Sequence, residues 1–397
     1  MDTPIVVIQG ARQVGKSTLA AHLASTRPSL ILSLDDPATR TFAEDDPSGF
    51  VAQANDRLLV IDEAQRAPQL VLPIKAAVDR DRRPGRFLLT GSSDLLRVRG
   101  VGDSLAGRAE TVALHPFSQG ELARRTTPES LVSALVAGPL TTTGKDPDTI
   151  VDAVVRGGFP VPLTRTPRRA DVWFSDYVDR LTRHDARDLA GPVFSQRLGG
   201  LLRVLASQGQ SELVVAKLAR SAGIPERTLA DYLELLETMF LTRSLPSWGA
   251  GLSGRATRRP KVALLDTGLS AQLARFSVAK AGHVGGREYF GLLLEQFVAQ
   301  ELSRQRAWSP VRYDLYHYRT TDGDEVDLVL ELDDGRIIAI EVKSAQAITQ
   351  RALDPLARLR SRLGDRLIAG VVLHPGGRSY RMHDWLHVLP INAMWEH

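Results

Sequence analysis

A glycine-rich run near the start of the chain offers the clearest chemistry in the sequence. Residues 5–8 form a short β-branched run that predicts a buried strand, and residues 19–23 continue with the leucine spacing of a helix. Between them stand Gly10, Ala11, Arg12, Gln13, Val14, Gly15, Lys16, Ser17 and Thr18. Strand, glycine loop and helix in this order are typical of a phosphate-binding loop, whose backbone N–H groups wrap phosphates. We expect Lys16 to reach the β- and γ-phosphates of ATP and Ser17 to bind Mg²⁺.

A pair of adjacent carboxylates follows the second predicted strand. Residues 57–61 form this strand, with an apolar run at 58–61, and Asp62 and Glu63 come directly after it. Ligands of α/β sheets bind at the carboxyl ends of the strands. We therefore expect Asp62 to hold magnesium through its water shell and Glu63 to orient or deprotonate the attacking water. The structural alternative is an acidic cap on the following helix.

Two further side chains are candidates for the same reaction. Ser92 lies in a Gly-Ser-Ser turn after a predicted strand at 86–90, where its hydroxyl could touch the γ-phosphate or the water. Serine and glycine are also ordinary turn residues. Arg108 precedes a predicted strand at 111–114 and is a candidate finger that completes the site of a neighbouring subunit. A solvated arginine is the alternative for this position.

The bulk composition is that of a soluble protein with several domains. A length of 397 residues predicts about two to four domains. We expect neither a membrane span nor a signal peptide, and the lack of cysteine excludes disulfides and fits a reducing cytoplasm. The net charge of +4 does not by itself demand a nucleic acid. Only seven of the 50 basic residues are lysine, so a lysine inside a motif indicates a need for an ammonium group.

A second group of charged residues lies in the last quarter of the chain. Two predicted strands follow one another there, and Glu341 and Lys343, two residues apart, share one face of the second strand. A hairpin would bring Asp327 beside them, where two carboxylates can hold magnesium and a lysine can polarise a phosphate or the attacking water. The pattern resembles that of PD-(D/E)xK nucleases, with Glu295 on the preceding predicted helix as a further candidate ligand. The alternatives are a nuclease fold that no longer cleaves and a surface ion pair.

The segment between these two groups is mainly helical in its pattern. Residues 118–190 are predicted to form a helical lid or linker, with a break at 140–149 that is rich in Thr, Gly, Pro and Asp. Within it, Arg183, His184 and Asp185 are either a sensing cluster or an ordinary helix surface.

Residues 197–248 have the pattern of a winged helix. Helices are predicted around 201–205, 213–220 and 226–239, with a wing at 240–245. The glycine-containing turn before the third helix is typical of helix-turn-helix motifs.

A role of this region in DNA binding rests on a few side chains. Arg227, Thr228 and Tyr232 of the third predicted helix are candidates for DNA contact, but acidic residues on the same helix oppose a phosphate backbone and favour packing against protein. A basic stretch just downstream is the better candidate for phosphate contact, with solvated charge as its alternative. It consists of Arg255, Arg258, Arg259 and Lys261.

The order of the motifs is more specific than any single one. The segments are 10–18, 59–65, 88–93, 105–108, 115–121, 157–160, 260–268, 325–327 and 341–343. Together they resemble prokaryotic AAA-type ATPases joined to a C-terminal region catalogued as domain of unknown function 4143. The resemblance spans nearly the whole chain and implies catalytic sites shared between subunits. Such proteins usually carry a segment before the first strand that contacts the adenine; here the strand begins almost at Met1, so we expect a cropped chain or an open base pocket.

These inferences predict an α/β protein: a P-loop AAA-type ATPase core, a helical lid, a winged helix and a restriction-endonuclease-like α/β C-terminal domain. The predicted boundaries are 1–124, 125–192, 193–252 and 253–397. We expect an ATP-hydrolysing protein whose nucleotide state regulates the DNA-acting C-terminal domain. The alternative is a nucleotide-gated assembly or signalling scaffold whose nuclease fold binds a partner without cleaving. ATP and Mg²⁺ are the expected cofactors, the expected state is a cytoplasmic homo-oligomer, and DNA is a candidate partner.

Overall fold

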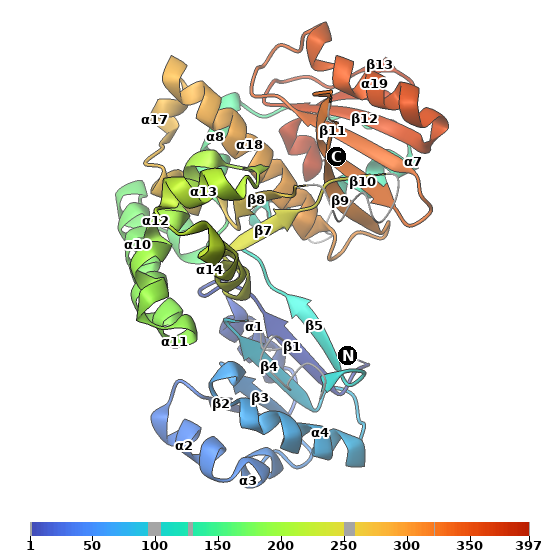
Figure 1. The fold of residues 1–397 in the computed structure, drawn as a ribbon. Helices are drawn as coiled ribbons and strands as arrows, with labels where there is room; N and C mark the ends of the chain where they lie inside the picture. Colours follow the sequence, from blue (N-terminus) through green and yellow to red (C-terminus); the bar gives the residue numbers. More distant parts are fainter. Residues whose placement is uncertain (1, 94–104, 126–129, 250–258, 321, 397) are drawn as a thin grey trace. The chain divides into compact units, whose positions relative to one another are not determined.

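The chain divides into two compact units in a computed structural model of the protein. The structure describes residues 2–93, 105–125, 130–249, 259–320 and 322–396. One unit contains residues 1–116 and 234–241, and the other contains residues 117–233 and 242–397 (Figure 1). Arg255 and Arg258 of the predicted basic stretch lie outside the described residues.

The first unit is built on a parallel sheet of five strands. These are β1 (Ile5–Gln9), β2 (Ser29–Ser33), β3 (Leu58–Asp62), β4 (Phe87–Gly91) and β5 (Ala109–Ala113), in the order β2-β3-β4-β1-β5 (Figure 1). The strands predicted at 5–8, 57–61, 86–90 and 111–114 are thus present. β1 and β4 are buried along their whole length, as central parallel strands covered on both faces are. This is the sheet expected of a P-loop ATPase core.

Helices cover both faces of this sheet because its side chains alternate between them. Val6 and Ile8 pack with residues of α1 (Lys16–Ser25), while Ile5 and Val7 pack with residues of the helices on the other face. Those helices are α2 (Pro37–Asp45), α3 (Pro47–Ala52) and α4 (Val71–Arg80). The loop that follows β1 therefore emerges at the carboxyl edge of the sheet, beside the ends of β3 and β4.

The second unit begins with the helices that the sequence predicts. They are α6 (Gln119–Leu122), α7 (Leu131–Ala137), α8 (Pro147–Arg156), α9 (Pro160–Leu163), α10 (Pro167–Arg180), a π-helical turn (Leu181–Asp185) and α11 (Ala186–Ala190). The sequence predicts a break at 140–149; residues 140–146 form no helix, but residues 147–149 already belong to α8. The rings of Phe159, Trp173, Phe174 and Tyr177 pack together beside α9 and α10, with Trp173 stacked on Tyr177 and the other pairs tilted or edge-on.

Three more helices and a small antiparallel sheet follow. They are α12 (Pro192–Gln208), β6 (Ser211–Glu212), α13 (Val215–Ala222), α14 (Glu226–Thr238), β7 (Thr242–Leu245) and β8 (Lys261–Leu264), with sheet order β6-β8-β7. The three helices lie where the sequence places them, while the winged-helix assignment stays a prediction. β8 pairs with β6 and β7, although the boundary at residue 253 assigns it to the C-terminal domain.

A mixed six-stranded sheet organises the C-terminal part. Its strands are β9 (Tyr313–Arg319), β10 (Glu325–Leu332), β11 (Ile337–Val342), β12 (Leu367–His374), β13 (Tyr380–His383) and β14 (Leu386–Pro390), in the order β13-β14-β12-β11-β10-β9 (Figure 1). The helices are α16 (Thr267–Leu273), α17 (Val278–Ala281), α18 (Val284–Gln305) and α19 (Asp354–Leu363). Alternate residues of β10 and β11 pack with α18 and with α19, so the two helices lie on opposite faces of the sheet.

Candidate ATP site and a second carboxylate cluster

The glycine-rich loop has a backbone that only glycine accommodates at two points. Gly15 immediately precedes α1 with φ 105°, a conformation that side chains disfavour. A Cβ atom on Gly10 would lie 2.1 Å from the carbonyl oxygen of Leu114, so the close approach of β1 and the segment after β5 requires a glycine. The loop therefore ends directly at the amino terminus of α1, where backbone N–H groups are available to an anion.

Lys16 is held inside this loop. Its side chain is only 5% exposed, and its Nζ atom donates to the carbonyl oxygens of Gly10 and Ala11, each at 2.9 Å. Burial lowers the pKa of Lys16 to about 8, although the Glu63 and Asp62 carboxylates act in the opposite direction. An arriving phosphate would restore the favourable surroundings of the ammonium.

Ser17 and Asp62 meet across the carboxyl edge of the sheet. The Ser17 hydroxyl lies 3.0 and 3.1 Å from the two carboxylate oxygens of Asp62. Thr90, at the end of β4, donates its hydroxyl to Asp62 and accepts the backbone N–H of Glu63 at 3.1 Å. A hydroxyl and a carboxylate in contact are the hard oxygen donors that Mg²⁺ prefers, so this pair fits the expected ion.

Glu63 occupies a strained position at the end of β3. Its φ of 58° and ψ of 44° are left-handed, which is uncommon for a residue with a side chain and is concentrated at functional sites. The carboxylate accepts hydrogen bonds from the Ser92 hydroxyl, at 2.8 Å, and from the Gln65 amide, which also donates to Ser92 at 3.0 Å. The Glu63 side chain forms no capping hydrogen bond with the short 3₁₀ turn that follows. The alternative interpretation, an acidic helix cap, therefore does not explain this residue.

Two members of this site were not among the predicted catalytic residues. Thr90 orients Asp62 and the backbone of Glu63, and Gln65 holds the Glu63 carboxylate against Ser92. Gln65 stands two residues after Glu63 in the sequence, and this proximity could have indicated that it contacts the Glu63 carboxylate. Thr90 carries no such signal, because a threonine at the end of an apolar strand is ordinary.

Arg108 lies at the other end of the sheet. Ile5 pairs with Ala109 in the β1–β5 register, so Arg108 precedes the amino edge, while the glycine loop follows the carboxyl edge. Five strand residues separate the edges by roughly 13–17 Å. Arg108 Nε instead donates to Asp79 at 2.7 Å, and this hydrogen bond holds the pKa of Asp79 below its ordinary value. Arg108 therefore takes no part in the ATP site of its own chain, and its action on a neighbouring subunit stays a prediction.

The C-terminal sheet brings three predicted side chains together. The pairing of Leu328 with Ile340 places Asp327 and Glu341 opposite one another on β10 and β11. Glu341 accepts from Lys343 Nζ at 2.6 Å, and Asp327 accepts the backbone N–H of Val342 at 2.8 Å. Burial, followed by the nearby Asp327, raises the pKa of Glu341 to about 8.

Glu295 is held by Lys261, a member of the predicted basic stretch. Lys261 Nζ lies 2.6 Å from Glu295 Oε1 and 2.9 Å from Glu325 Oε1, and the lysine side chain is only 4% exposed. Burial opposes the charge of Lys261, yet Glu295, Asp327 and Glu325 raise its pKa above the ordinary value. Burial and Asp327 also raise the pKa of Glu295 to about 8. The sequence makes Lys261 a candidate for phosphate contact, with solvated charge as the alternative, but β8 carries its side chain into this carboxylate cluster, where it pairs with Glu295 and Glu325.

Of the described side chains, the cluster offers only two carboxylates, Asp327 and Glu341, as candidate ligands for a metal ion. Within the residues that the structure describes, no three or more His, Asp and Glu side chains are grouped to hold a metal ion. Asp327 and Glu341 are two adjacent carboxylates and remain the candidates. Glu295 is engaged by Lys261, which removes its side chain from the predicted ligand set in this arrangement.

Two of the three candidates for DNA contact on α14 are committed elsewhere. The Tyr232 ring is buried against Phe194, and its hydroxyl donates to the Val193 carbonyl oxygen at 3.3 Å. The Thr228 hydroxyl donates to the Pro225 carbonyl oxygen at 3.0 Å. Arg227 is exposed and remains the candidate.

The candidate sensing cluster of the lid falls in the π-helical turn. Arg183 and His184 are exposed there, and Arg183 pairs with Asp179 at 3.3 Å, while Asp185 is buried. Arg183 and His184 thus have the surroundings of a helix surface.

Three family models match successive parts of the chain. Residues 2–123 match an AAA domain, residues 147–280 match the domain of unknown function DUF8612, and residues 290–394 match the domain of unknown function DUF4143. The AAA match, the parallel sheet and the glycine loop support ATP binding and ATPase activity in the first unit. No helix among the described residues is both long enough and apolar enough to span a membrane.

Similar proteins extend over nearly the whole chain. Uncharacterized proteins of Mycobacterium tuberculosis and Mycobacterium bovis are each 28% identical over 395 residues, which are 98% of this chain and 81% of theirs. A RuvB variant of Thermotoga maritima is 19% identical, with 60% of this chain and 81% of that chain covered and a TM-score of 0.28. That score is too low to bear on fold or function.

Proposed function

We propose that the protein is a magnesium-dependent ATPase whose nucleotide state regulates a DNA-acting site in its C-terminal part. The observation that carries the ATPase half is the convergence of Lys16, Ser17, Asp62 and Glu63 at one edge of the parallel sheet. An ammonium, a hydroxyl and two carboxylates at the end of a phosphate-binding loop are the set that phosphoryl transfer to water requires.

Each of these residues has a distinct task in the proposed reaction. Lys16 binds the β- and γ-phosphates, and Ser17 and Asp62 would hold Mg²⁺, which supplies positive charge against the phosphates when bound. Glu63 orients the attacking water and accepts its proton. Ser92 and Gln65 fix the Glu63 carboxylate by their hydrogen bonds, and Thr90 fixes Asp62.

Two substitutions separate phosphate binding from hydrolysis. Lys16→Ala should abolish binding of a fluorescent ATP analogue, because the phosphates lose the ammonium that the loop holds. Glu63→Gln should retain binding and lower phosphate release by at least about a hundredfold, because water activation alone is removed. Lys217→Ala, which changes an exposed lysine on α13, is the control. Hydrolysis by Glu63→Gln at the parent rate would overturn the assignment of roles.

The DNA-acting half rests on Asp327, Glu341 and Lys343. These residues support a metal-assisted nuclease centre in which the two carboxylates hold a divalent ion and the lysine acts on the phosphate. In a Lys16→Ala background, Mn²⁺ binding measured by calorimetry should persist, and it should vanish when Asp327→Ala or Glu341→Ala is added. Lys343→Ala should keep the ion and lose cleavage of duplex or single-stranded DNA.

The ion pair of Lys261 with Glu295 favours the second candidate function. A lysine inside the carboxylate cluster leaves fewer donors for a metal, which suits a partner-binding fold that no longer cleaves. Mn²⁺-independent DNA or protein binding, with no cleavage by the parent protein, would support the scaffold over the nuclease.

A further inference from the structure

Two sequence motifs with no part in either site are joined by one buried carboxylate. Asp266 is fully buried, and its two oxygens accept the backbone N–H groups of Gly158, at 2.8 Å, and Leu269, at 3.1 Å. A Cβ atom on Gly157 would lie 2.3 Å from Asp266, and one on Gly268 would lie 2.4 Å from the Arg156 carbonyl oxygen. Glycine is therefore required on both sides of this joint, which holds the end of α8 against the start of α16.

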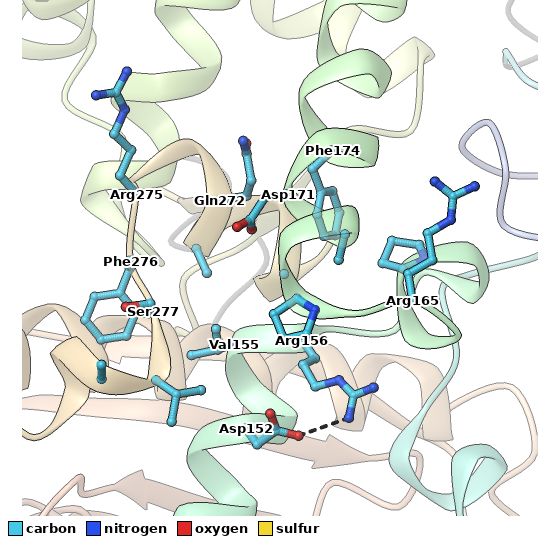
Figure 2. Close-up of a pocket in the computed structure, with 17 residues that line it drawn as sticks. Asp152, Val155, Arg156, Arg165, Asp171, Phe174, Gln272, Arg275, Phe276 and Ser277 are labelled. Atoms are coloured by element: carbon cyan, nitrogen blue, oxygen red, sulfur yellow. Dashed lines mark hydrogen bonds and ion pairs between the residues drawn. The ribbon is translucent and has the colours of Figure 1, made fainter.

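A cavity of about 640 Å³ lies beside this joint, entirely within the second unit. Its walls come from α8, α9, α10, α16 and α17, and all its lining residues fall within the segment matched by DUF8612 (Figure 2). Phe174 and Phe276 are buried aromatic side chains of the lining, and Val155, Pro162 and Ala271 add apolar surface. The volume is that of a typical small-molecule pocket, about 300–1,000 Å³.

Three arginines surround this apolar interior. Arg156 is paired with Asp152 at 3.2 Å and also donates to the Leu163 carbonyl oxygen. Arg165 and Arg275 make no ion pair among the described residues, and Figure 2 shows them on either side of Phe174 and Asp171. Three arginines against Asp152 and Asp171 leave the lining with a net charge of +1.

Arg275 occupies a backbone position that favours glycine. Its φ is 52°, and the Phe276 N–H returns to the Ala271 carbonyl oxygen at 2.7 Å, the pattern of a helix that ends in a left-handed residue. This turn places Phe276 in the lining and Arg275 at its rim. A residue with a side chain in this conformation is strained, and such strain is concentrated at binding sites.

We propose that this cavity binds a small molecule with an apolar, partly aromatic body and an anionic head group. The body packs on Phe174 and Phe276. The head group takes hydrogen bonds from Arg165 or Arg275, exposed rim side chains that point outward in Figure 2 and turn toward the cavity to reach it. None of the lining residues belongs to the ATP site or to the Asp327–Glu341 cluster, so the site is separate from the proposed function.

The probe for this site is 1-anilinonaphthalene-8-sulfonate, an aromatic sulfonate that fluoresces in apolar surroundings. We expect one saturable site that persists in the presence of excess ATP and in Lys16→Ala. Octanoate should displace the probe, and octanol at the same concentration should do so at least about tenfold less effectively, because only the carboxylate engages the arginines.

Paired variants locate the site. Arg165→Gln with Arg275→Gln should weaken the probe about tenfold or more, the effect of losing charge-assisted contacts. Arg168→Gln with Arg169→Gln, which changes two exposed arginines of α10 outside the lining, should leave its affinity unchanged. Ala170→Trp should fill the cavity and abolish binding.

Three outcomes would overturn the proposal. They are equal affinity in the Arg165/Arg275 and Arg168/Arg169 double variants, unchanged binding in a folded Ala170→Trp protein, and equal displacement by octanol and octanoate. The arginine variants change exposed side chains, so they keep the test decisive if Ala170→Trp fails to fold.

Discussion

The Lys261 ammonium lies 2.6 Å from the Glu295 carboxylate, in surroundings where neither side chain has much access to water. The lysine comes from β8 of the small antiparallel sheet, and the glutamate comes from α18. Each therefore supplies the charge that makes the burial of the other tolerable. Three carboxylates of the cluster, Glu295, Glu325 and Asp327, act on this one lysine.

Lys261→Met should destabilise the protein by about 3–5 kcal/mol at pH 9, because it removes the partner of the buried Glu295 carboxyl group, which is ionised above about pH 8. The raised pKa of Glu295, from 4.5 to about 8, means that its protonated form is the better tolerated one. The stability that this shift contributes is present below about pH 4.5 and is lost as the pH rises through about 8. We therefore expect a larger loss at pH 9 than at pH 5, measured as the midpoint of urea unfolding.

The double variant Lys261→Met with Glu295→Gln should recover part of that stability and lose the pH dependence of the effect. Lys217→Met, at an exposed position, is the control. Equal destabilisation by Lys261→Met at both pH values would show that packing of the lysine, and not its charge, matters at this position.

Gln65→Ala should lower kcat for ATP by roughly tenfold to a hundredfold while KM stays close to that of the parent. The reason is that Gln65 acts on the reaction through the Glu63 carboxylate and forms no hydrogen bond with the described residues 10–18 of the loop that binds the phosphates. Steady-state phosphate release at several ATP concentrations measures kcat and KM separately. Gln53→Ala, at an exposed position in the same unit, is the control, and a rise in KM without a change in kcat would contradict the role given to Gln65.

ATP affinity should depend on pH through Lys16. Its pKa of about 8 in the free protein means that the ammonium needed by the phosphates is lost as the pH rises through that value. Affinity of a fluorescent ATP analogue should be constant below about pH 7 and fall by up to tenfold per pH unit above about 8. Lys16→Arg should bind more weakly at every pH because the guanidinium is larger than the ammonium, but it keeps its charge, so its remaining affinity should not change up to pH 9.5. If the affinity of the parent protein did not change with pH, the inference that burial lowers the pKa of Lys16 would be refuted.

ATP turnover should need a second subunit if Arg108 acts on a neighbouring site. Activity per chain should rise with protein concentration, and Arg108→Ala should lower turnover more than nucleotide binding. Mixing Arg108→Ala with Lys16→Ala chains should restore some activity, because one interface then contains both intact halves. Asp79→Asn removes the carboxylate that pairs with Arg108 within the chain. Chains that carry Asp79→Asn together with Lys16→Ala should still restore activity to Arg108→Ala chains. If the two inactive variants assemble with each other and no ATP turnover returns, Arg108 has only a structural role.

The sequence alone was sufficient for the parts of the ATP site that are continuous along the chain. Residues 10–18 form strand end, loop and helix start in one run, and Asp62 and Glu63 follow their strand directly. Local conformation dictates such features, because the glycines and the apolar strands act over a few residues. The same holds for the strands of the first sheet and for the order of helices after residue 118.

Only the tertiary structure decided which distant side chains meet. Thr90 reaches Asp62 because β3 and β4 pair in parallel, and no local pattern specifies that register. Lys261 reads as one more charge in a basic stretch, yet the pairing of β8 with β6 and β7 buries it beside Glu295. Arg108 is likewise placed by the β1–β5 register, far from the loop of its own chain. The physical reason is that burial and charge pairing depend on contacts between segments far apart in the chain, and those form only when the whole fold does.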